Sequence, residues 1–119
     1  MKSLKNFFKS FVYAGNGLQL AVQQRNFRLH IVSFLILIAM CLFFDIKTWE
    51  FIVLLICAAG VLSLEIVNTS IEKTVDYIST ERNEQAKAIK DLAAAAVLVF
   101  SLFSLLIAIW IFLPYLWAL

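Results

Sequence analysis

The sequence contains few of the charged residues that a water-soluble domain needs. Only 15% of the residues are charged and 63% are hydrophobic, with a mean hydropathy of +0.92. Soluble domains carry about a quarter charged residues, so this composition excludes that class and predicts a membrane protein. The net charge of +2 is too small to indicate nucleic-acid binding, and no such partner is expected.

The chain is also poor in cysteine, glycine and proline. Cys41 and Cys57 lie in separate apolar runs without CxxC spacing, so we predict neither a disulfide nor a metal role for them. Gly15 and Gly17 do not form a phosphate loop, because the later glycine and the preceding strand of that motif are missing. The single proline, Pro114, is near the end of the last apolar run, where a missing backbone donor does least harm.

Three long apolar runs organise what we expect to be a single domain over residues 1–119. They predict three transmembrane helices, at about residues 29–47, 49–71 and 92–117. The charged residues 72–91 connect the last two. Before them, residues 3–24 place phenylalanines and lysines on opposite sides of a helix, which favours an amphipathic helix in the headgroup plane over an ordinary core-facing stripe.

Basic residues are distributed unevenly around these spans. Five precede the first span, four lie between the second and third, and Lys47 alone lies on the other side. The positive-inside rule then places the N-terminus and residues 72–91 in the cytoplasm, with the C-terminus outside.

An acidic stripe marks the cytoplasmic end of the second span. A carboxylate at the depth of Glu65 costs about 2.5–3.5 kcal/mol on insertion scales, so a functional role is the default interpretation. At about 100° per residue, Thr69, Glu72 and Asp76 fall within a narrow arc with Glu65, and Asn68 lies at its edge. This pattern predicts a reaction site where the bilayer meets the cytosol.

Depth assigns different chemistry to the two glutamates. Glu65 lies ~10 Å deeper along the helix than Glu72, at 1.5 Å per residue. The deep carboxylate could act as general base for a lipid hydroxyl, and the shallow one could hold Mg²⁺ beside nucleotide phosphates. Lys90, next to Asp91, could bind a phosphate at the same depth, which together would suit phosphoryl transfer.

Other interpretations stay open at this point. Glu72, Lys73, Asp76 and Lys90 could form a solvated helix end with ion pairs. A small proton-coupled exporter would also use an intramembrane glutamate, but it gives residues 72–91 no clear purpose. An assembly scaffold would tolerate amides in place of the carboxylates. His30 stands alone and is expected to be an interfacial residue rather than a catalytic one.

Three stretches resemble motifs of a known family. Residues 65–76 are similar to E-x-x-N-[ST]-[AS]-I-E-x-x-V-D, and residues 90–98 to K-D-x-[AG]-[AGS]-A-A-V-L, both from the prokaryotic diacylglycerol kinase family. Residues 26–30 resemble the N-F-R-[IL]-H stretch of its undecaprenol kinase branch. The resemblance covers essentially the whole chain, and its first motif is long and specific.

The resemblance implies an all-α membrane protein, with a surface helix and three transmembrane helices, that assembles as a homotrimeric bundle. It implies transfer of the γ-phosphate of ATP, with Mg²⁺ as cofactor, to a lipid alcohol in the bacterial inner membrane. Membrane lipids and copies of the chain are then its partners. Apolar spans do not distinguish an acyl from a polyprenyl chain, but the N-F-R-[IL]-H stretch favours undecaprenol over diacylglycerol.

The resemblance also assigns roles to individual residues. Glu65 is the general base and contacts the substrate together with Asn68, while Glu72 binds the metal. The expected nucleotide-binding residues are Tyr13, Glu72, Asp76, Glu81, Arg82, Asn83, Lys90 and Asp91. Gln24 occupies the place where the family usually has a second metal-binding glutamate, so we expect weaker metal affinity there.

Overall fold

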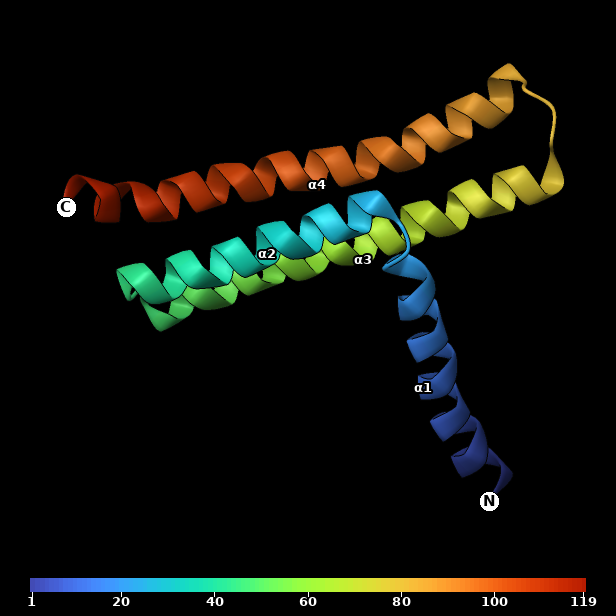
Figure 1. Cartoon of the computed structure of the whole chain (residues 1–119), viewed down its shortest axis with the longest axis horizontal. Coiled ribbons are helices and arrows are strands. Elements are labelled where there is room, and N and C mark those ends of the chain that lie inside the picture. Colours follow the sequence, from blue (N-terminus) through green and yellow to red (C-terminus); the bar gives the residue numbers. More distant parts are fainter.

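The computed structural model describes residues 1–119 and contains four α-helices and no strand. They are α1 (Lys2–Ala21), α2 (Arg25–Phe44), α3 (Thr48–Ile78) and α4 (Glu84–Trp117). In Figure 1, α2, α3 and α4 run side by side, and α1 projects away from them at the N-terminus. The predicted all-α fold is confirmed, and α2, α3 and α4 are each long and apolar enough to cross a membrane.

Helix α1 makes little contact with the other three. Its phenylalanines Phe7, Phe8 and Phe11 are exposed, while Ala21 at its end is buried. A row of exposed aromatic rings next to lysines is unfavourable in water and suits a headgroup region. The placement of this helix on the membrane surface stays a prediction.

The connection between α2 and α3 is tight and is fixed by a buried carboxylate. Asp45 ends α2 with φ 50°, a left-handed conformation that aspartate tolerates better than most residues. The Lys47 backbone N–H donates to Glu50 Oε1 at 3.0 Å, and the Tyr115 hydroxyl donates to the same oxygen. Glu50 therefore links the start of α3 to the end of α4.

Helices α3 and α4 extend beyond the spans expected from hydropathy. Helix α3 ends at Ile78 rather than at residue 71, and α4 begins at Glu84 rather than at residue 92. Only residues 79–83 connect them, and the Asn83 side chain caps α4 by accepting from the Ala86 N–H at 2.7 Å. The charged residues 72–91 are therefore mostly helical, and two helix ends lie beside each other there.

Packing between α3 and α4 is the most extensive helix contact. A Cβ added to Gly60 would overlap Cζ of Phe100, so the missing side chain on α3 leaves the space that the ring on α4 fills. Toward the other end, Cys41, Leu54 and Phe112 belong to a small buried cluster. Cys41 and Cys57 are both free and buried.

The outer faces of the bundle remain apolar and exposed. At most 22% of the residues in the apolar stretch of α2, α3 or α4 are buried within the chain. A single chain in water would expose far more hydrocarbon than soluble monomers do. These faces require lipid, or other copies of the protein, to cover them.

Candidate active site

Two buried polar residues lie in the part of α3 that packs against α2. Glu65 is 4% exposed and Asn68 is 5% exposed. The imidazole Nε2 of His30, on α2, lies 3.8 Å from Glu65 Oε2. Asn68 Nδ2 donates to Glu72 Oε1 at 3.3 Å, which connects this pair to the next turns of α3. The predicted stripe is thus a physical cluster that also includes a residue from α2.

Side-chain exposure increases along the acidic stripe from Glu65 to Asp76, the order expected if Glu65 lies deepest in the membrane. Glu65 is buried, Glu72 is half-buried, and the Asp76 side chain is 65% exposed. The helix places Asp76 ~16 Å from Glu65 along the axis, and all three carboxylates within about 40° of one another. One face of α3 therefore runs continuously from a desolvated acid to solvated ones.

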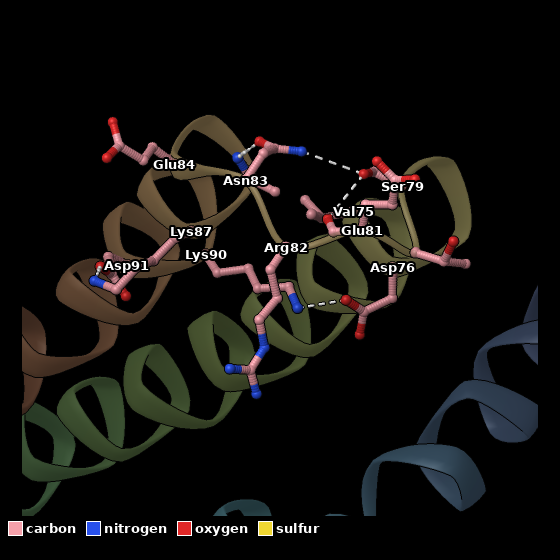
Figure 2. Close-up of a pocket in the computed structure, with 12 residues that line it drawn as sticks. Val75, Asp76, Ser79, Glu81, Arg82, Asn83, Glu84, Lys87, Lys90 and Asp91 are labelled. Carbon is pink, nitrogen blue, oxygen red and sulfur yellow. Dashed lines mark hydrogen bonds and ion pairs between the residues drawn. The ribbon is translucent and has the colours of Figure 1, made fainter.

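A pocket lies where α3 ends, the connection turns and α4 begins (Figure 2). Its volume is about 540 Å³, and its lining is mostly polar or charged. Asp76 on α3 accepts from the ammonium group of Lys90 on α4, and this ion pair crosses the pocket. Asn83 Nδ2 donates to Ser79 Oγ at 3.2 Å and closes the connection above it.

The cationic side chains that line the pocket differ in whether they have an acidic partner. Lys87 Nζ lies 2.7 Å from Asp91 Oδ2, and this hydrogen bond to the Asp91 carboxylate raises the pKa of Lys87. Arg82 forms neither an ion pair nor a hydrogen bond, and its guanidinium stands apart from the dashed interactions in Figure 2. A planar guanidinium without a partner is suited to bidentate binding of phosphate.

The structure brings together most, but not all, of the predicted nucleotide-binding residues. Six line the pocket: Asp76, Glu81, Arg82, Asn83, Lys90 and Asp91. Glu72 lies one turn of α3 before the pocket. Tyr13 is 66% exposed on α1 and does not line it. Gln24 occupies the N-cap position of α2 without a side-chain capping hydrogen bond, and its metal role stays a prediction.

The residues around Glu72 fit a magnesium ion that arrives together with phosphates. Asn68 Oδ1 is buried without a hydrogen-bond partner, and it belongs to the side chain that contacts the Glu72 carboxylate. No group of three or more acidic, histidine or cysteine side chains forms a ready cage. Mg²⁺ commonly uses one or two carboxylates, with water and substrate phosphates completing its six ligands.

Sequence reasoning missed two features of this region. It treated His30 as a lone interfacial residue, although the structure places it against Glu65. It also gave no role to Lys87, which lines the pocket and pairs with Asp91. The second was visible as an i, i+4 pair on a helix. The first depends on how α2 and α3 pack, which no local pattern in the sequence reveals.

Comparison with known proteins matches nearly the whole chain to one family. The profile of prokaryotic diacylglycerol kinases matches residues 12–112. Undecaprenol kinase of Bacillus subtilis is 40% identical over 112 residues, which cover 93% of this chain and 91% of that protein. Diacylglycerol kinase of Helicobacter pylori is 37% identical over 109 residues, covering 89% and 84%. Diacylglycerol kinase of Escherichia coli is 30% identical over 92 residues, covering 76% and 75%.

Proposed function

The chain belongs to the prokaryotic diacylglycerol kinase family and is a lipid kinase, and we propose that it phosphorylates undecaprenol with ATP at the cytoplasmic membrane surface. The observation that carries this proposal is the gradient of burial along one face of α3. A buried acid at Glu65 and a cation-bearing pocket beyond Glu72 provide separate places for a lipid hydroxyl and for a triphosphate.

In the proposed reaction, Glu65 accepts the proton of the lipid hydroxyl. The lipid oxygen bonds to the γ-phosphorus, and the bond from that phosphorus to the bridging oxygen of ADP breaks. ADP leaves, and the proton on Glu65 passes to water before the next cycle. Burial of Glu65 keeps water away from the reacting oxygen, which favours transfer to lipid over hydrolysis.

The pocket residues would hold the nucleotide. Arg82 is free to contact phosphate oxygens, and Lys90 would exchange its carboxylate partner for a phosphate. Glu72 and the unpartnered Asn68 Oδ1 would hold Mg²⁺, which neutralises phosphate charge when bound. We keep Tyr13, Glu81, Asn83 and Asp91 as further nucleotide contacts and Gln24 as a weak, neutral metal ligand.

The exposed apolar faces support an assembly in the bacterial inner membrane. We propose a homotrimer, the assembly that the family resemblance implies, in which copies of the chain would cover part of these exposed faces. The excess of lysine and arginine places the N-terminus and the α3–α4 connection in the cytoplasm, where ATP is present.

Undecaprenol is favoured over diacylglycerol by two observations. Residues 26–30 carry the N-F-R-[IL]-H stretch, and the undecaprenol kinase of Bacillus subtilis is more similar to this chain than the diacylglycerol kinases named above. Membership of a kinase family sets aside the exporter and the scaffold as alternatives.

A direct assay tests both the reaction and the substrate. The purified protein is incubated with Mg²⁺ and γ-labelled ATP, in parallel with undecaprenol and with diacylglycerol, and the extracted lipids are separated. We expect label mainly in undecaprenyl phosphate, and at least about 10²-fold slower labelling with Glu65→Gln. Label mainly in phosphatidic acid would overturn the substrate, and label in neither lipid would overturn the proposed reaction.

A further inference from the structure

We propose that His30 is a positioning residue that orients the Glu65 carboxylate toward the lipid hydroxyl. The inference rests on the proposed role of Glu65 as general base. His30 lies on α2, and neither the acidic stripe of α3 nor the motif of residues 65–76 gives it a role.

The geometry points to this pairing. His30 Nε2 and Glu65 Oε2 lie 3.8 Å apart, which is the distance of an ion pair, and a small shift of the ring would form a hydrogen bond. The Glu65 side chain is only 6% exposed and that of His30 is 28% exposed, so water competes little for the carboxylate. A hydrogen bond from α2 would therefore restrict the orientation of the Glu65 carboxylate.

Three other cations near this end of the bundle have partners other than Glu65. Lys90 pairs with Asp76, and Lys87 pairs with Asp91. Arg28, half a turn before His30, directs its guanidinium to the carbonyl oxygens of Val22 and Gln23. His30 is the basic side chain that lies within ion-pair distance of Glu65.

The surroundings of the imidazole explain why this contact would orient both partners. His30 also lines a cavity of about 340 Å³ between α2, α3 and α4, with mainly apolar walls. Ser33, the neighbouring polar side chain on α2, donates to the Leu29 carbonyl at 3.0 Å. Because packing leaves space beside the ring, a hydrogen bond to the Glu65 carboxylate would fix the orientation of the ring.

A histidine is also chemically suited to assist a base. A neutral imidazole N–H can orient a carboxylate by hydrogen bonding, whereas a permanent cation at the same place would lower its affinity for a proton. Loss of orientation should lower turnover and leave substrate binding unchanged, because a misplaced base slows the chemical step.

Two variants of similar size separate orientation from packing. His30→Gln keeps a side-chain N–H donor, and His30→Leu removes it. We expect His30→Leu to lower kcat by about 10- to 100-fold with little change in either KM. His30→Gln should recover most of the lost turnover. Wild-type kcat in His30→Leu, equal losses in both variants, or a change confined to KM would overturn the proposal.

A second measurement does not depend on activity. Thermal midpoints of wild type, His30→Leu, Glu65→Gln and the double variant in detergent form a double-mutant cycle. We expect non-additive shifts, because the two side chains are in contact, and strict additivity would count against the pairing. An inactive wild-type protein would overturn the proposed function instead, and the cycle would still report on the contact.

Discussion

Lys90 on α4 forms an ion pair with Asp76, fourteen residues earlier at the end of α3. The pair joins the two helices across the pocket that holds most of the predicted nucleotide-binding residues. A bound triphosphate would compete with Asp76 for the same ammonium group. The ion pair therefore keeps Lys90 within the pocket before a nucleotide arrives.

Removing the charge of Lys90 should weaken nucleotide binding. A hydrogen bond to a charged group contributes about 1.5–3 kcal/mol, so Lys90→Met should raise the KM for ATP about tenfold or more. Lys73→Met is the matched control, because Lys73 is exposed on α3 and does not line the pocket. Equal KM values for the two variants in a steady-state assay would contradict the assignment.

Two buried glutamates on α3 should respond differently to the same change. Glu65→Gln should lower kcat by at least about 10²-fold, the usual contribution of a general base, while the assembly and its thermal midpoint remain. Glu50→Gln should keep near-normal turnover and lose about 1 kcal/mol of stability, because Tyr115 and the Lys47 N–H bond its carboxylate.

Turnover, size-exclusion profiles and thermal melts of the two variants check this contrast. Near-normal activity in Glu65→Gln would refute its role as base. If Glu50→Gln also lost activity with its assembly intact, the loss in Glu65→Gln would not indicate a specific role as base, because replacing either buried glutamate of α3 would have the same result.

Gln24→Glu should strengthen the magnesium dependence of activity. A carboxylate adds a charged ligand where the family usually has one, so the midpoint of a Mg²⁺ titration should fall several-fold. Gln23→Glu adds the same charge at the neighbouring, exposed position and should leave the midpoint unchanged. An unaltered titration with Gln24→Glu would place the metal away from this residue.

The contact between Gly60 and Phe100 gives a prediction about stability. Any side chain at Gly60 would overlap the Phe100 ring, so Gly60→Leu should reduce the free energy of unfolding by about 1–3 kcal/mol. Combining it with Phe100→Ala should restore part of the loss, since the ring is what the new side chain meets. Thermal melts of the single and double variants would show whether this rescue occurs.

Hydropathy alone located the three apolar helices, because bilayer thickness imposes a minimum length on each span. Its spans are shorter than the helices: α3 continues past residue 71 and α4 begins before residue 92, since a charge ends an apolar run without ending a helix. Strong helix formers follow Asn83, and this asparagine caps α4, so capping chemistry could have corrected that boundary.

In the candidate site too, the sequence predicts what lies on one helix and does not predict the contacts between helices. Glu65, Asn68 and Glu72 belong to one helix, so their common face follows from spacing alone. The contact of His30 with Glu65 and the pairing of Lys90 with Asp76 join different helices. Such contacts depend on the register and rotation of packed helices, which a sequence pattern on one helix does not determine.

Helix α3 is unbroken for 31 residues, ~46 Å at 1.5 Å per residue, while a hydrocarbon core is about 30 Å thick. In the proposed reaction, the distance between the lipid hydroxyl and the nucleotide phosphates is therefore set by one rigid helix and does not depend on the surrounding lipid. A thicker or thinner membrane would change the tilt of α3 and leave this distance constant.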